Sequence, residues 1–100
     1  MAKRDKKQAL LDALRHPLRR SLLRRYLEST EKLSPRELAD LEKESLSLVS
    51  YHVRELVRLG ALELVDTKQV RGSLQHFYLP TSGVKRSPLI RTALGMGKGG

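Results

Sequence analysis

The sequence predicts a mainly α-helical fold with one small β-hairpin, on the basis of two periodic patterns and the turn after them. Apolar residues recur at helical spacing from residue 8 to Gly60, and the strand-like segments ALELVDTK and LQHFYL follow. A basic, glycine-containing loop, QVRGS, separates these two segments, as a hairpin requires. The chain has 100 residues, which suits a single small domain.

The first two predicted helices meet at a proline. The first is expected over residues 8–15, and His16 ends it because the residue before a proline is disfavoured in a helix. Pro17 then suits the first turn of the second helix, where its missing N–H costs nothing. Arg19 and Arg20 fall outside the apolar face of this second helix.

The third and fourth helices are separated by a short polar turn, EKES. The motif SPRE, residues 34–37, is a capping box that begins the third helix. The side chains expected to point inward from it are Leu38, Ala39 and Leu41. Ser45 or Ser47 caps the fourth helix, and Gly60 suits its end.

The domain organisation follows from these elements. Residues 1–7 are expected to be a flexible basic N-terminus, and residues 8–80 to form the folded domain. Residues 81–100 form a basic tail, with a short helix over residues 88–94 and a disordered end, GMGKGG.

Charge and composition point to a polyanionic partner. The net charge is +9, and no acidic residue follows Asp66 although lysines and arginines continue to the end, which favours binding of nucleic acid. The chain has no cysteine, which excludes disulfides, thiolate metal sites and cysteine nucleophiles. No apolar run is long enough for a membrane span or a signal peptide, so a cytoplasmic protein with no membrane partner is expected.

No motif indicates catalysis or a metal. The sequence has no G-x-S-x-G, P-loop or G-x-G-x-x-G pattern, and no convincing carboxylate pair. His52 has Glu55 three residues on, but leucines stand four residues to either side where a second ligand is typical. The prediction is therefore a protein with no catalytic residues, cofactor or metal, in which His52 bonds locally at the helix edge or approaches a phosphate.

The fourth helix presents a polar face opposite its apolar stripe. The stripe consists of Val49, Val53, Leu56 and Val57. A solvated surface is the ordinary interpretation of such a face, but a tyrosine is costly where nothing covers its ring. An α-helix fits the major groove of B-DNA, where an arginine can read guanine and a leucine can pack on a thymine methyl. The expected recognition residues are Ser47, Leu48, Ser50, Tyr51, Arg54 and Arg58, with Arg54 on bases and Arg58 on phosphate.

The hairpin adds basic residues next to this helix. Lys68 and Arg71 are expected at its tip, where they either protect an exposed edge from aggregation or contact the DNA backbone. Arg19 and Arg20 are expected to neutralise further phosphates. A short acidic helix, a tight turn, an arginine-bearing helix and a basic hairpin follow one another as in a winged helix-turn-helix.

Over residues 11–80 the chain resembles the ArsR-type winged helix-turn-helix transcriptional regulators, most specifically in SYHVRELVRLGALE and VRGSLQHFY, and most closely their cysteine-free branch. The resemblance implies a cytoplasmic homodimer that binds operator DNA, usually as a repressor. It places recognition-helix contacts on Ser45, Ser47, Leu48, Ser50, Tyr51 and Arg54, and a wing contact on Arg71. It places dimer contacts on Leu10, Leu11, Leu14, Leu89, Ile90 and Leu94. Lys43 stands where the family usually has a glycine, and the cysteine metal motif is absent.

The sequence therefore predicts a homodimeric, sequence-specific regulator of transcription that binds double-stranded DNA. Two alternatives stay open. One is a winged helix that docks an acidic protein through its Tyr51 and Arg54 face, and the other is a chromatin-like binder without sequence preference.

Overall fold

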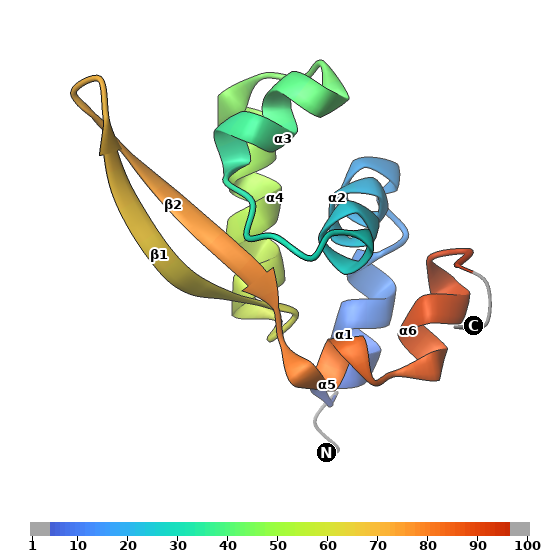
Figure 1. Cartoon of the computed structure of the whole chain (residues 1–100). Coiled ribbons are helices and arrows are strands. Elements are labelled where there is room, and N and C mark those ends of the chain that lie inside the picture. Colours follow the sequence, from blue (N-terminus) through green and yellow to red (C-terminus); the bar gives the residue numbers. More distant parts are fainter. Residues whose placement is uncertain (1–4, 97–100) are drawn as a thin grey trace.

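The computed structural model describes residues 5–96, apart from the side chain of Lys6, and contains six helices and an antiparallel two-stranded hairpin among them (Figure 1). The predicted class, mainly helical with a small hairpin, is confirmed. In chain order the elements are α1 (Lys6–Ala13), α2 (Pro17–Glu28), α3 (Pro35–Glu42), α4 (Leu46–Arg58), β1 (Leu62–Val70), β2 (Ser73–Pro80), α5 (Ser82–Lys85) and α6 (Pro88–Ala93).

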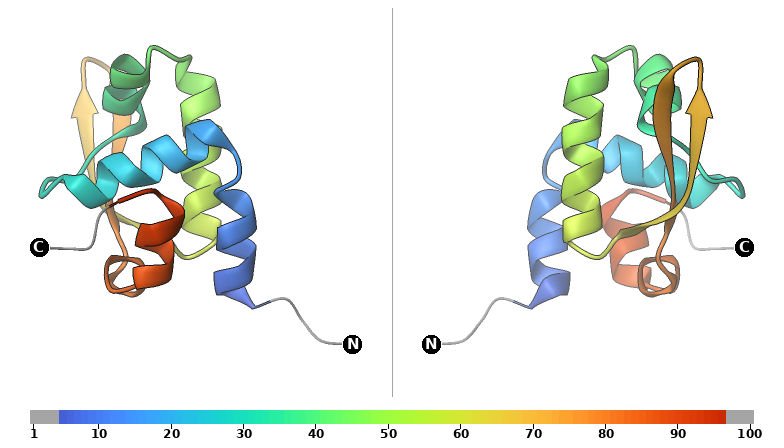
Figure 2. Two further views of the ribbon diagram at one scale, coloured as in Figure 1. Left: turned by 90° about the vertical axis from the view of Figure 1, so that its right-hand side faces the viewer. Right: turned by 90° about the vertical axis from the view of Figure 1, so that its left-hand side faces the viewer.

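The elements are arranged around one core. Helices α2, α3 and α4 pack together, and the hairpin stands beside α3 and α4 with its turn pointing away from the terminal helices (Figures 1 and 2). Helices α1, α5 and α6 lie at the opposite end of the molecule. The apolar side chains that lose all exposure are Leu22, Leu23, Tyr26, Leu38, Val49, Val53, Leu56 and Ala61.

A short junction joins the helices to the base of the hairpin. Leu33, in the loop between α2 and α3, exchanges two backbone hydrogen bonds with Tyr78 of β2, at N···O distances of 3.1 and 2.9 Å. The Leu33 carbonyl also accepts a bond from the hydroxyl of the fully buried Tyr26, at 2.9 Å. Burial raises the pKa of the Tyr26 hydroxyl, so it remains a donor in neutral solution. Helix α2, the loop that follows it and the distant strand β2 are thereby joined at one point.

Two helix starts show how local chemistry sets the boundaries. The predicted capping box is confirmed: the Ser34 hydroxyl accepts from the Glu37 N–H, and the Glu37 carboxylate accepts from the Ser34 N–H at 2.8 Å. Helix α1 begins at Lys6 rather than at Gln8, because the Asp5 carboxylate accepts from the Gln8 N–H at 2.7 Å and caps the helix earlier.

The C-terminal segment contains one expected helix and one that was not predicted. Helix α6 matches the helix expected over residues 88–94 but ends one residue sooner, at Ala93. Helix α5 has only four residues and no side-chain cap, so it leaves little pattern in the sequence. Of the GMGKGG end expected to be disordered, Met96 packs partly against the core, and residues 97–100 lie outside the described residues, as do residues 1–4.

Lys43 adopts the conformation for which a glycine would be the usual choice. Its φ of 56° is left-handed, and the Glu44 N–H bonds back to the Ala39 carbonyl at 3.1 Å, which ends α3 with a Schellman-type turn. Gly60, with a φ of 82°, makes the same kind of turn after α4 without the steric cost that a side chain brings. The turn before α4 therefore keeps its ordinary shape despite the lysine.

The hairpin turn is tighter than the sequence suggests. Val70 pairs with Ser73, so only Arg71 and Gly72 form the loop, and both have positive φ, 51° and 79°. Two positive φ values characterise the type I′ turn, which matches the right-handed twist of the strands. The prediction of a longer loop that includes Lys68 is wrong, because β1 continues to Val70 and Lys68 pairs with Gln75 within the sheet.

The prediction that Leu41 points into the core is also wrong. Leu41 is 54% exposed, whereas Leu38 and Ala39 are buried. The inward face of α3 is centred on Leu38, Ala39 and Glu42, which lie three and four residues apart, and Leu41 falls to the side of that face. Across residues 5–96, none of the helices is long and apolar enough to cross a membrane.

Replacing Lys43 by glycine should stabilise the fold. Removing the side chain relieves about 1–2 kcal/mol of left-handed strain, from which glycine's entropy in the unfolded chain subtracts about 0.5–1 kcal/mol. The expected gain in the free energy of unfolding is about 0.5–1 kcal/mol, measured by urea denaturation. Lys43→Ala is the control, because it removes the charge and keeps the strain. Equal stabilities of Lys43→Ala and Lys43→Gly would contradict this account.

Candidate nucleic-acid interface

The outward face of α4 carries most of the predicted recognition residues. Ser47, Leu48, Tyr51 and Arg54 are exposed, and Ser50 is half-buried beside them. Ser45 has a structural role, because its hydroxyl accepts from the Leu48 N–H at 3.1 Å and caps the helix. The choice left open between Ser45 and Ser47 is therefore decided for Ser45, and Ser47 stays on the surface.

The opposite face of α4 holds the helix in place. Val49, Val53 and Leu56 have no exposure, and they pack in the core formed with α2 and α3. Burying such side chains contributes roughly 1.5–3 kcal/mol each. Since the apolar face can point only inward, the polar residues of α4 must point outward.

Arg58, at the C-terminal end of α4, is engaged with an acid of its own helix. Its guanidinium donates to the Glu55 carboxylate at 2.7 and 3.3 Å. These hydrogen bonds lower the pKa of Glu55 below its usual value. The predicted phosphate contact of Arg58 thus begins from a neutralised pair, whereas Arg54, predicted to contact bases, has no such partner among the residues described.

Two adjoining hollows run from α4 to the tip of the hairpin. The first, about 240 Å³, is lined by Arg54 and Ser50 of α4, by the start of α3 and by β2. The second lies next to it and reaches Val70 and Arg71. Both are lined by Arg36, Ser73 and Gln75. We call these two hollows the arginine groove, after Arg36, Arg54 and Arg71.

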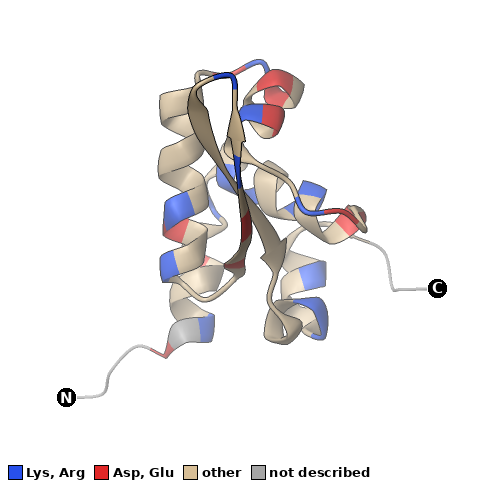
Figure 3. Cartoon of the chain, turned by 60° about the vertical axis from the view of Figure 1, so that its left-hand side comes forward, with Lys and Arg blue, Asp and Glu red and all other residues tan. Residues whose placement is uncertain are grey.

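In the described part of the chain, the three arginines of this groove have no acidic partners, a property that they share with Arg15, Arg19, Arg20, Arg86 and Arg91. Elsewhere, Arg24, Arg25 and Arg58 pair with glutamates at 2.6–3.2 Å. Among residues 5–96, no carboxylate lies within ion-pair distance of Arg36, Arg54 or Arg71, and all three are exposed. On the hairpin, the acidic residues lie toward the base and the basic ones toward the tip (Figure 3). The groove therefore presents uncompensated positive charge to solvent.

Arg19 lies beside α4 and contacts two of its residues. Its Nε donates to Nδ1 of His52 at 3.0 Å, and its guanidinium carbon lies 6.0 Å from the centre of the Tyr51 ring. His52 is only 2% exposed, and the ring of His16 lies 4.4 Å away. Burial and the charge of Arg19 lower the pKa of His52, which favours the neutral imidazole.

This arrangement corrects the predicted environment of His52. The sequence predicts an edge residue that bonds locally or approaches a phosphate, whereas the side chain is buried and bonds a residue 33 positions away. The turn at Pro17 brings α2 back across α4, which no periodicity within α4 could indicate. No cluster of three His, Asp or Glu residues suited to holding a metal ion occurs in the described part of the chain.

Lys68 lies on the hairpin but below its tip. Its ammonium is 5.6 Å from the centre of the Phe77 ring, and Lys32 approaches the same ring at 5.8 Å. Lys32 also pairs with Asp66 at 2.6 Å, which holds the loop before α3 against the hairpin base and lowers the pKa of Asp66. Of the two basic residues expected at the tip, only Arg71 is there.

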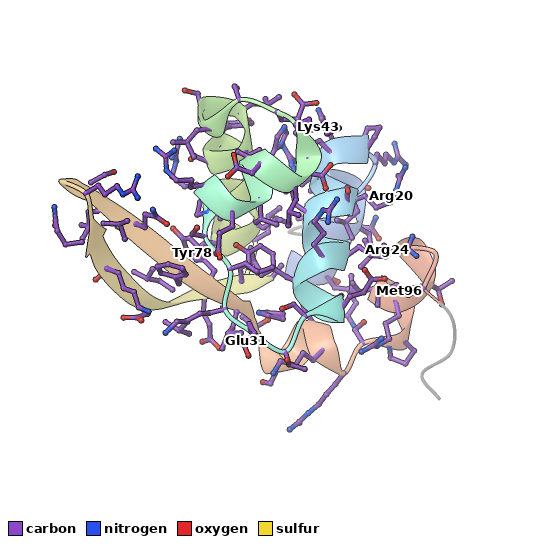
Figure 4. The ribbon with its side chains drawn as sticks, turned by 45° about the horizontal axis from the view of Figure 1, so that its top comes forward. Arg20, Arg24, Glu31, Lys43, Tyr78 and Met96 are labelled. Carbon is purple, nitrogen blue, oxygen red and sulfur yellow. The ribbon has the colours of Figure 1, made fainter. Side chains whose placement is uncertain are left out.

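Several predicted residues lie away from the groove. Arg20 projects from α2 on the side away from the hairpin, and it donates to the Leu14 carbonyl at 3.1 Å (Figure 4). Among the predicted dimer contacts, Leu11 is partly buried and Leu89 is 49% exposed. The other four are part of the core of this chain: Leu10, Leu14, Ile90 and Leu94.

Sequence reasoning missed part of the groove lining. Arg36 could have been found, because an arginine is almost never fully buried unless it is paired. Leu46 is 40% exposed where α4 begins. The β2 contribution depends on a bulge in β1 between Leu64 and Asp66, which shifts the pairing and leaves no signal in the apolar pattern. That contribution consists of Ser73, Leu74, Gln75, His76 and Tyr78.

A scan of the chain against models of known protein families finds no match. A search of curated proteins finds no significant similarity.

Proposed function

We propose that the chain is a winged helix-turn-helix protein that binds double-stranded DNA with sequence preference. In this proposal α3 and α4 are the helix-turn-helix, α4 enters the major groove, and the hairpin is the wing. The observation that carries it is the arginine groove, with Arg36, Arg54 and Arg71 unpaired and exposed between α4 and the hairpin tip.

Charge alone would fit any polyanion, so the surface of α4 carries the argument for duplex DNA. It presents small hydroxyls, one apolar side chain and one arginine together, namely Ser47, Ser50, Leu48 and Arg54. These are groups that read base edges, since arginine bonds guanine and apolar groups contact the thymine methyl. Arg36 and Arg71 then position the helix on phosphates. A cytoplasmic homodimer acting as a repressor is the further part of the proposal, and it rests on the resemblance to ArsR-type regulators.

Selection of bound sequences from a pool of random duplexes tests this function. We expect one sequence to be enriched at physiological salt, and a palindromic winner if the protein binds as a homodimer. Binding to all duplexes without enrichment would support the chromatin-like alternative. Absence of binding would overturn the proposal in favour of a protein-docking module, because such a module has no need for DNA affinity.

Replacing Arg54 by alanine should weaken binding to the selected sequence by roughly 1–3 kcal/mol and reduce the preference among sequences. The reason is that Arg54 is proposed to bond a base edge. The measurement is a fluorescence titration with the selected and a scrambled duplex. Arg24→Ala removes the same charge from α2, on the side away from the hairpin, and should leave the preference unchanged (Figure 4). An equal loss on both duplexes in Arg54→Ala would make Arg54 a phosphate contact only.

Replacing Arg71 by alanine should weaken binding to selected and random duplexes alike. Since one phosphate contact is lost, the slope of log affinity against log salt should fall by about one. The measurement is a salt titration of both variants and the wild type. Arg86→Ala, which removes an exposed charge next to α5 at the other end of the molecule, serves as the control. A slope that Arg71→Ala leaves unchanged would rule out the contact between wing and phosphate.

A further inference from the structure

The hydrogen bond between Arg19 and His52 requires a neutral imidazole whose Nδ1 carries no proton. The Nε–H of Arg19 is a donor, so Nδ1 of His52 must supply a lone pair to the 3.0 Å bond. The proton of the neutral ring is then on Nε2. A proton added to Nδ1 would remove the acceptor and leave two cations facing each other.

The same contact supports Tyr51 on the outward face of α4. Tyr51 is 49% exposed, yet its ring has neighbours on two sides. The Arg19 guanidinium lies 6.0 Å from the ring centre, and the His52 ring meets it edge-on at 5.1 Å. Arg19 thus bonds the buried ring of His52 and lies against the exposed ring of Tyr51 at the same time.

The charged groups around His52 oppose its protonation. From α2 and its N-cap, Arg19 and His16 face the ring, and both are or can become cations. From α4, Glu55 favours a charged His52, but its carboxylate already accepts two bonds from Arg58. Burial acts in the same direction as Arg19 and His16, and the pKa of His52 lies below its usual value as a result.

We propose that His52 is a positioning residue, whose neutral imidazole fixes Arg19 against Tyr51, and that protonation of His52 releases both side chains and weakens DNA binding. This rests on the proposed DNA-binding function. We call the three residues the His52 latch. Its direction is unusual, because positive charge gained by a protein toward acid pH ordinarily strengthens binding to DNA. Without the latch, affinity should rise toward acid pH.

DNA affinity measured from pH 7.5 to 5.5 at constant ionic strength separates these expectations. The wild type should lose affinity progressively toward pH 5.5, by less than about tenfold, because a single proton weakens binding only as far as the free protein takes it up and the pKa of His52 lies below its usual value. His52→Asn should bind within about threefold of the wild type at pH 7.5 and show no acid loss, since its Oδ1 can accept from Arg19 and does not titrate. His52→Ala should bind weakly at every pH. Wild-type affinity that rises toward acid pH would overturn the proposal.

His16→Asn is the matched control for the other ring. It should keep the acid loss of affinity, because the latch remains intact. Loss of the acid effect in His16→Asn together with its retention in His52→Asn would assign the titration to His16 and refute the proposal.

A measurement on the free protein keeps the latch distinct from DNA binding. By NMR at pH 7.5, His52 should show the Nε2–H tautomer, and the Arg19 Nε–H and Tyr51 ring signals should shift as His52 titrates. The free energy of unfolding should be fully retained above pH 6.5 and fall as the pH drops below that value, because the unfolded chain then binds the proton more strongly. His52→Asn should lack this decline. Arg19 and Tyr51 signals that do not shift as His52 titrates would overturn the His52 latch. Signals that do shift, in a protein that does not bind DNA, would refute the proposed function instead.

Discussion

The position of the hairpin depends on the junction of Tyr26, Leu33 and Tyr78. A two-stranded hairpin is marginally stable alone, so it needs support from the rest of the fold. Here the support is a pair of backbone bonds from Leu33 and a buried hydroxyl that bonds the same carbonyl. The ion pair of Lys32 with Asp66 adds a second attachment beside it. These contacts set the distance between β2 and α4, and therefore the width of the arginine groove.

The distribution of charge follows from that geometry. The acidic side chains of Glu42 and Asp66 hold separate elements together. Glu42, for example, accepts from Ser21 and Arg25 and ties α3 to α2, and these bonds outweigh burial and lower its pKa. Among residues 5–96, the arginines of the groove form no ion pair that joins elements. Their like charges repel one another, which lowers the stability of the folded chain. Of the cations that the structure describes, Arg24, Arg25, Lys32 and Arg58 are thus paired with carboxylates, whereas the three groove arginines remain free.

Helix α4 has two sides with different roles. Its inward side is ordinary core, and its outward side is proposed to meet DNA. His52 lies between them, buried but in contact with both Tyr51 and Arg19. Residues at and just after the α1–α2 junction surround His52. A residue of α4 therefore has its hydrogen-bond partner, Arg19, 33 positions earlier in the chain.

The order of the helices, the capping box, the faces of α4 and the existence of the hairpin could be predicted from the sequence, because each depends on residues within a few positions of one another. The predictions that were wrong concern contacts between residues far apart in the sequence. Leu41, the two-residue turn and the partner of His52 depend on packing or pairing between distant segments. Four of the six leucines and isoleucines expected at a dimer contact belong to the core, since an apolar stripe does not state what covers it. Local chemistry determined the elements of this protein, and only tertiary contacts decided which side chains share the groove.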